Sequence, residues 1–166
     1  MNSIKILDIF IGNKCNFTCF QCDTRSDIFR KGEHDLELEN IKQGITLAKE
    51  KFLIHNYSLL GGEPLLYLDR VEEILKHIRS YDTETVIMMP TNGSLIDRHV
   101  DRLAYLIKEY KVFLVVCDHF SAFVDNTRSV DLRKKTQLLL DKLNYERVDP
   151  TEFFYKIMDW NNTAKD

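Results

Sequence analysis

The sequence lacks internal repeats, low-complexity tracts and linkers rich in proline or serine, and its 166 residues include only 3 prolines and 6 glycines. A chain of this length without a linker is expected to form one domain. Its composition is 44% apolar and 30% charged. This is typical of an ordinary globular protein and argues against collagen, coiled coil and disorder.

The sequence also has no large excess of positive or negative charge. The formal net charge is -3, so nothing basic favours binding to nucleic acid or to an anionic membrane. No apolar run approaches the roughly 20 residues needed to cross a bilayer. The first residues, MNSIKILDIFIGNKC, contain Lys5 and Asp8 and lack a small-residue cleavage site, which argues against a signal peptide. We therefore expect a cytoplasmic protein without membrane association.

Cysteine is scarce, but its few residues are clustered. Cys15, Cys19 and Cys22 lie close together, whereas Cys117 stands alone. Disulfide pairing would leave one of the three without a partner, and in the cytosol such a cluster favours metal binding. The spacing suits zinc or an iron–sulfur cluster. A structural zinc site needs a fourth ligand, for which His34 or Cys117 are candidates, whereas a four-iron cluster on three thiolates keeps one iron open.

Short runs typical of strands alternate with longer helical periods. The strand-like runs are 4–11, 57–60, 85–89, 111–117 and 153–158. Apolar residues at steps of three and four predict four helices between these runs. The first helical stripe consists of Leu38, Ile41, Ile45, Ala48 and Phe52, and the other helices are predicted at 68–78, 98–110 and 130–143.

This alternation predicts parallel βαβ units with right-handed crossovers. Its count, (βα)4β, is too small for a closed eight-stranded barrel of about 250 residues. We therefore predict an α/β fold, a partial (βα) barrel of about five parallel strands with helices on the outer face. The domain is expected to cover residues 1–158, followed by a polar tail at 159–166.

Each distinctive motif directly follows a predicted strand. The three clustered cysteines follow the first strand, and the carboxyl ends of parallel strands share the edge of a sheet where ligands bind. We therefore expect these motifs to form one site. The later motifs, in chain order, are Gly61-Gly62-Glu63-Pro64, Pro90-Thr91-Asn92-Gly93 and Cys117-Asp118-His119.

C-x3-C-x2-C after a first strand, GGEP after a second and TNG after a third resemble the radical S-adenosylmethionine (radical SAM) superfamily over roughly the first 120 residues. The resemblance implies a minimal member without a C-terminal auxiliary-cluster domain. In it, Cys15, Cys19 and Cys22 hold a [4Fe–4S] cluster whose open iron binds S-adenosylmethionine. One electron cleaves this cofactor to methionine and a 5′-deoxyadenosyl radical, which abstracts a hydrogen atom from the substrate.

The GGEP turn is assigned to S-adenosylmethionine by the same resemblance. The backbone of Gly61 and Gly62 can approach the methionyl ammonium group closely, and Gly62 is expected against it. Glu63 can hold the turn or supply a charged acceptor, two roles that the sequence leaves open. Pro64 fixes φ where the chain leaves the turn.

Five further residues are expected to contact S-adenosylmethionine. Thr91 and Asn92 carry polar groups suited to the carboxylate or the ribose. The residue before the last cysteine, aromatic in the family, is Gln21 here, with Phe20 one place earlier, and we expect this pair near the adenine. Asp118 matches an aspartate that follows the fourth strand in the family and is expected at the ribose.

We therefore expect a radical SAM enzyme that acts on a small metabolite or nucleotide, or on a residue of a protein partner. An external electron donor of the flavodoxin or ferredoxin type is expected. The family core has six βα units and the sixth strand is missing here, so a protein partner or a homodimer is expected to close the barrel. The alternative is a catalytically degenerate iron–sulfur or zinc-binding module of the same fold, favoured by Gln21, by Val116 at a serine position and by the missing strand.

Overall fold

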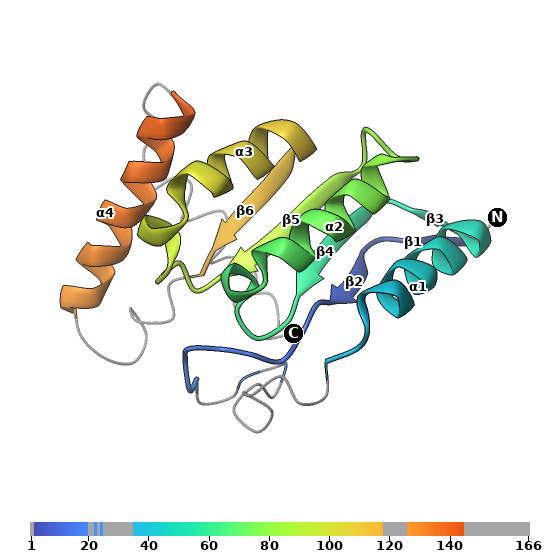
Figure 1. Cartoon of the computed structure of the whole chain (residues 1–166), viewed down its shortest axis with the longest axis horizontal. Coiled ribbons are helices and arrows are strands. Elements are labelled where there is room, and N and C mark those ends of the chain that lie inside the picture. Colours follow the sequence, from blue (N-terminus) through green and yellow to red (C-terminus); the bar gives the residue numbers. More distant parts are fainter. Residues whose placement is uncertain (1, 20–21, 23, 25–34, 118–125, 145–166) are drawn as a thin grey trace, which may run out of the picture. The chain divides into compact units, whose positions relative to one another are not determined.

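The computed structural model (Figure 1) describes residues 2–19, 22, 24, 35–117 and 126–144. It divides into two compact units. Unit 1 comprises Met1–Pro90 and Leu106–Leu114, and unit 2 comprises Thr91–Tyr105 and Val115–Asp166.

Unit 1 is built on parallel strands. The four-stranded sheet, which belongs to unit 1 except for Thr91, Val115 and Val116, has the order β2-β4-β5-β6, and a two-stranded sheet joins β1 to β3. The β1–β3, β2–β4 and β4–β5 pairs are all parallel, which confirms the predicted α/β class. The strands are β1 (Asn2–Ile4), β2 (Leu7–Phe10), β3 (Phe52–Ile54), β4 (Asn56–Leu60), β5 (Val86–Thr91) and β6 (Val112–Val116).

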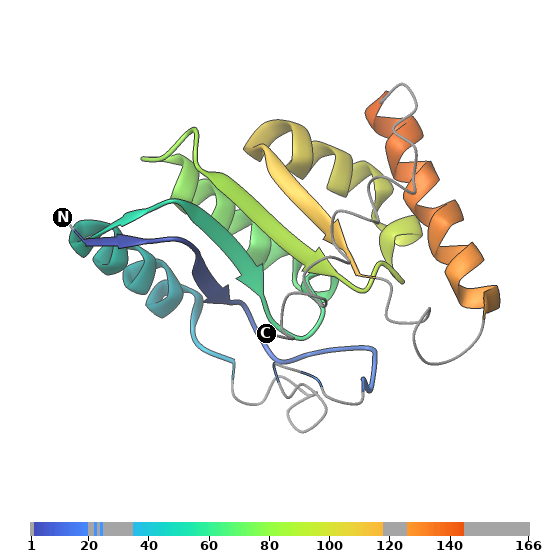
Figure 2. The ribbon, with the colours of Figure 1, turned by 180° about the vertical axis from the view of Figure 1, so that it is seen from behind.

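The helices α1 (Leu38–Lys51) and α2 (Leu68–Arg79) lie on the same side of the sheet, as Figures 1 and 2 show from opposite directions. The apolar stripe of α2 is fully buried, because its side chains recur at helical spacing on one face. Each such side chain contributes about 1.5–3 kcal/mol by leaving water. The buried residues of α2 are Leu68, Val71, Ile74, Leu75 and Ile78.

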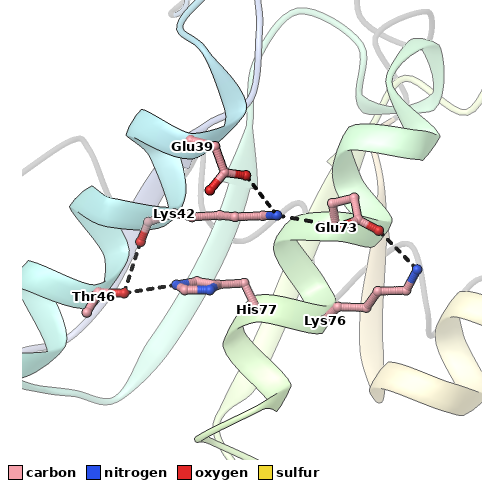
Figure 3. Close-up of polar contacts among 6 residues, drawn as sticks. All are labelled: Glu39, Lys42, Thr46, Glu73, Lys76 and His77. Atoms are coloured by element: carbon pink, nitrogen blue, oxygen red, sulfur yellow. Dashed lines mark hydrogen bonds and ion pairs between the residues drawn. The ribbon is translucent and has the colours of Figure 1, made fainter.

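Polar contacts join α1 to α2 (Figure 3). The Lys42 ammonium group lies 3.2 Å from Glu39 and 3.5 Å from Glu73. The Thr46 hydroxyl donates to the Lys42 carbonyl (3.1 Å) and, since it has a single hydrogen, accepts from His77 Nε2 (3.0 Å). Lys42–Glu73 and Thr46–His77 thus link the facing sides of the two helices.

The predicted strand over residues 4–11 forms two strands, β1 and β2. Their partners β3 and β4 are interrupted at the corresponding position. β1 ends at Ile4 and β2 begins at Leu7, while His55 separates β3 from β4. The His55 N–H donates to the Ile4 carbonyl (3.0 Å), and Asn56 Nδ2 donates to the carbonyl of Lys5 (3.0 Å). The break is therefore hydrogen-bonded on both sides.

Two predicted boundaries also change. Phe52 was predicted as the last apolar position of the first helix, but it begins β3, where it pairs with Asn2. Its N–H still donates to the carbonyl of Ala48, so the helix passes directly into the strand. The predicted strand 85–89 continues through Pro90 to Thr91. Proline is tolerated there because the β4–β5 pairing ends at Met88, so Pro90 does not need an N–H to bond to β4.

Unit 2 contains η2 (Ile96–Arg98), the first residues of α3 (Val100–Tyr110), and α4 (Asn126–Leu143). The predicted helix 130–143 is confirmed and begins four residues earlier. η2 contacts α4, and the Lys142 ammonium lies 2.6 Å from Asp101. The predicted strand 153–158 and tail 159–166 lie outside the described residues. Among the described helices, none is long and apolar enough to cross a membrane.

Candidate functional site

The cysteine segment, residues 15–22, begins shortly after β2. Cys15, Cys19 and Cys22 carry reduced thiols and are partly exposed. The Phe17 N–H donates to Cys15 Sγ (3.4 Å), and Cys22 Sγ lies 3.3 Å from the Thr24 hydroxyl. In the described part of the chain, no three side chains of Cys, His, Asp and Glu are gathered closely enough to hold a metal ion.

The surroundings of the segment disfavour isolated thiolates. Burial raises the pKa of the Cys15 thiol, and the charges of Glu63 and of the other two thiolates raise it further, against the lowering hydrogen bond from Phe17. Burial and the neighbouring Cys22 likewise raise the pKa of Cys19. Three adjacent thiolates are a soft, negatively charged donor set, which fits iron in a sulfide cluster or zinc.

The GGEP turn follows β4 and is hydrogen-bonded to the chain that leads into the cysteine segment. The Gly62 N–H donates to the Gly12 carbonyl (2.8 Å), and the Glu63 N–H donates to the Lys14 carbonyl (2.7 Å). Ile11 N–H donates to the Leu60 carbonyl (2.8 Å) just before the turn. Unit 1 therefore brings together these two predicted motifs, which lie about fifty residues apart in sequence.

Gly62 has a structural role that the sequence did not reveal. A Cβ atom at this position would overlap the carbonyl group of Lys14, so the close approach of the two backbones requires glycine. Because Lys14 directly precedes Cys15, any side chain at position 62 would press on the backbone next to the first cysteine.

Glu63 and Pro64 form the start of the short helix η1 (Pro64–Leu66). The Glu63 side chain is 1% exposed, and its Oε1 accepts from the Leu65 N–H (3.1 Å). Proline suits the first helical position, where no N–H is needed. Of the two roles left open for Glu63, the structure shows the first, since this carboxylate holds the turn.

In unit 2, Thr91 and Asn92 are buried and their side chains stabilise the turn after β5. The Gly93 N–H donates to Thr91 Oγ1 (3.0 Å), and both the N–H and the hydroxyl of Ser94 donate to Asn92 Oδ1 (3.0 and 2.6 Å). Gly93 has a φ of +72°, and a Cβ there would overlap Leu132 of α4. The predicted contacts of Thr91 and Asn92 with S-adenosylmethionine stay predictions.

The remaining predicted contact residues, Phe20, Gln21 and Asp118, lie outside the described residues, as does His34. Sequence reasoning missed a group that the fold brings to the cysteine segment, namely Asp35, Tyr67 and Arg70. No local pattern could reveal it, because Asp35 and Tyr67 are separated by 32 positions.

Comparison with known proteins identifies the family. The family model described as "Radical SAM superfamily" matches residues 9–142. The match covers most of the chain, including the cysteine segment and both turns, so the chain belongs to the radical SAM superfamily. Members of this superfamily use a [4Fe–4S] cluster and S-adenosylmethionine.

Three curated relatives are 28–33% identical to this chain over the aligned residues. The 7-carboxy-7-deazaguanine synthase of Methanothermobacter thermautotrophicus is 33% identical over 118 residues, covering 69% of this chain and 42% of the relative. The GTP 3′,8-cyclase of Microcystis aeruginosa is 32% identical over 108 residues, 62% of this chain and 32% of the relative. The radical SAM cyclopropyl synthase TigE of Paramaledivibacter caminithermalis is 28% identical over 128 residues, covering 68% of this chain and 26% of the relative. The chain thus spans less than half the length of these relatives.

Proposed function

We propose that this chain is a radical SAM enzyme in which Cys15, Cys19 and Cys22 hold a [4Fe–4S] cluster. When bound, the cluster supplies one electron that cleaves S-adenosylmethionine to methionine and a 5′-deoxyadenosyl radical, which takes a hydrogen atom from a substrate carbon to give 5′-deoxyadenosine and a substrate radical. The observation that carries the proposal is the hydrogen-bonded contact of the chain before Cys15 with the Gly61–Pro64 turn, inside the region matched by the family.

The proposal gives the protein two tasks at the cysteine segment. The three thiols must lose their protons and close around one cluster, as happens where metal binding and the ordering of a ligand loop are coupled. The Glu63 N–H holds the Lys14 carbonyl (2.7 Å), which fixes the backbone from which Cys15 extends. The backbone of Gly61 and Gly62 then presents a carbonyl acceptor to the ammonium group of S-adenosylmethionine.

The other contacts to S-adenosylmethionine are assigned by resemblance. Thr91 and Asn92 are proposed at its carboxylate or ribose and Asp118 at its ribose. Phe20 and Gln21 are proposed near its adenine. The strongest support is for Thr91 and Asn92, because both are held in a buried, hydrogen-bonded turn directly after a strand.

Architecture and partners complete the proposal. Residues 1–158 form a partial (βα) barrel and 159–166 a polar tail, and a protein partner or second copy closes the barrel. A flavodoxin- or ferredoxin-type donor supplies the electron. Of the two substrate classes, a small nucleotide-like molecule is favoured over a protein residue, because the names of two relatives contain GTP and a deazaguanine.

Anaerobic reconstitution tests the proposal. We expect a brown protein with about four irons and four sulfides per chain, which forms 5′-deoxyadenosine from S-adenosylmethionine when dithionite is present. A colourless protein with stoichiometric zinc contradicts the proposal. Iron without 5′-deoxyadenosine supports instead the degenerate module, which the buried Val116 at a serine position favours.

A further inference from the structure

Both ends of the chain that carries the cysteines are held by side chains from the start of α2. The Tyr67 hydroxyl donates to Asp35 Oδ2 (2.7 Å) and accepts from the Lys14 N–H (2.7 Å). The other oxygen of Asp35 accepts from the Asn13 N–H (2.6 Å). Lys14 lies just before the first cysteine and Asp35 lies well beyond the third, so these bonds join the chain before the cysteines to the chain after them. We call Asp35 and Tyr67 the clasp.

Arg70, one turn further along α2, strengthens this connection. Its guanidinium donates to the Ile11 carbonyl (2.8 Å) before the cysteines and to the Leu36 carbonyl (2.7 Å) after them. The aromatic ring of Tyr67 also fills the space beside Gly12, where a Cβ atom would overlap it. Hydrogen bonds and packing thus hold the same two pieces of backbone.

The Tyr67 hydroxyl keeps the proton that it donates to Asp35. Burial and the hydrogen bond to Asp35 raise the pKa of Tyr67 to about 12, so this hydroxyl remains a donor to the carboxylate throughout the neutral range. Bonds to a charged acceptor are stronger than neutral ones. The Tyr67 hydroxyl therefore stays protonated at neutral pH, as its hydrogen bond to Asp35 requires.

Lys14 is the residue through which the clasp acts. Its N–H is bound by Tyr67 and its carbonyl by the Glu63 N–H, so both of its peptide groups are fixed. The neighbouring peptide of Asn13 is fixed by Asp35. The direction in which the backbone enters Cys15 is consequently set by α2 and the GGEP turn together.

We propose that Asp35 and Tyr67 are positioning residues that hold Cys15 in place for cluster ligation and so slow the loss of iron. This inference rests on the proposed function, because it needs a cluster to position. Neither residue is proposed to touch iron or S-adenosylmethionine. A purely structural role would stabilise the fold equally with and without iron, whereas a positioning role acts on the bound cluster.

Tyr67→Phe removes only the clasp hydroxyl and keeps the ring. Its matched control is Tyr81→Phe, because Tyr81 lies in the same unit beyond the other end of α2, where its ring contacts His77 and Lys49. After anaerobic reconstitution, we expect a ferrous chelator to strip iron about tenfold faster from Tyr67→Phe than from wild type, consistent with the loss of a hydrogen bond to a charged group. Tyr81→Phe should match wild type.

Two further measurements separate positioning from folding. The apo form of Tyr67→Phe should melt only slightly below the wild-type apo-protein, because two hydrogen bonds of its hydroxyl are lost, and this small fall should not account for the faster loss of iron. The electron paramagnetic resonance spectrum of the reduced cluster should change in Tyr67→Phe and not in Tyr81→Phe. Asp35→Asn leaves one acceptor oxygen for two donors, the Asn13 N–H and the Tyr67 hydroxyl, so one of these two hydrogen bonds is lost. It should give an intermediate rate of iron loss, and the double variant should be no faster than Tyr67→Phe alone.

The outcomes are distinguishable. Wild-type protein that takes up no iron overturns the proposed function and this inference with it. Wild-type iron binding with an unchanged rate of iron loss in Tyr67→Phe overturns the clasp alone. Faster loss that follows an equal fall in apo stability also overturns the positioning role. If Tyr67→Phe fails to fold, Asp35→Asn alone decides by the same comparison.

Discussion

The turn after β4 and the turn after β5 each contain a glycine with no room for a side chain, but different groups occupy the space. Beside Gly62 it is the backbone carbonyl of Lys14, and beside Gly93 it is a terminal methyl group of Leu132. A backbone carbonyl moves only with its chain, whereas a terminal methyl group can change rotamer. The first turn is thus the less forgiving of the two.

This difference separates two roles within the proposed site. The first turn is bonded to the residues that precede Cys15, so a change there is expected to reach this proposed metal ligand. The second turn is held by α4, whose Lys135 donates to the Ser94 carbonyl (2.7 Å). A change there is expected to reach S-adenosylmethionine and leave the cluster in place.

Removing one proposed cysteine ligand should lower the iron content more than any change in the two turns. Cys19→Ala leaves two of the three thiolates, and we expect near-complete loss of iron after reconstitution, measured by metal analysis. The apo fold should be unchanged, because Cys19 is partly exposed. Cys117→Ala is the matched control and should keep its iron. Normal iron content in Cys19→Ala would contradict the ligand assignment.

Gly62→Ala tests the less forgiving turn. Its Cβ would overlap the Lys14 carbonyl, and overpacking of this kind costs about 1–3 kcal/mol. We expect both a lower free energy of unfolding and a marked loss of iron. The matched control is Gly44→Ala, since Gly44 lies in α1 with open space around it, and alanine there should stabilise the helix by about 1 kcal/mol. Full iron content in Gly62→Ala would remove the link between this turn and Cys15.

Gly93→Ala tests the turn after β5, for comparison with Gly62→Ala in the turn after β4. A φ of +72° costs a residue with a Cβ about 1–2 kcal/mol, and Leu132 must move. We expect this loss of unfolding free energy together with weaker binding of S-adenosylmethionine to the reconstituted protein and an unchanged iron content. Loss of iron as large as in Gly62→Ala would erase the distinction between the two turns.

Lys135→Met should have the smallest effect. The Lys135 side chain is 17% exposed and lies 3.2 Å from Asp97 and 3.4 Å from Asp131, in addition to its bond to Ser94. Losing one such hydrogen bond costs about 1 kcal/mol, which a urea titration can resolve. The exposed Lys134→Met on the same helix is the control. Equal midpoints for the two variants would show that Lys135 does not hold the turn.

The order of the elements could be predicted because it rests on local signals. The apolar stripe from Leu68 to Ile78 predicts α2 whatever the rest of the chain does. The glycine-containing motifs follow β4 and β5 directly, as the sequence predicts. These signals use residues within a few positions of one another. They also suffice for the resemblance that the family match confirms.

What the sequence could not predict depends on distant partners. Phe52 continues the helical stripe in sequence, yet it pairs with Asn2 as a strand residue. Tyr67 gives no local sign that it bonds to Asp35 and Lys14, since these contacts span 32 and 53 positions. The resemblance predicts Gly62 as a contact of S-adenosylmethionine, but its packing against Lys14 follows only from the fold.

The bond between Asn13 and Asp35 has a consequence for the entropy of loop closure. The two residues are 22 positions apart, and bringing the ends of a free segment of that length together costs about 3 kcal/mol at room temperature. Within the fold, the Asn13–Asp35 bond, together with the bonds of Tyr67 to Asp35 and Lys14, meets this cost. Iron and sulfide therefore enter a ring whose ends are already joined, so less of their binding free energy is consumed in ordering the polypeptide.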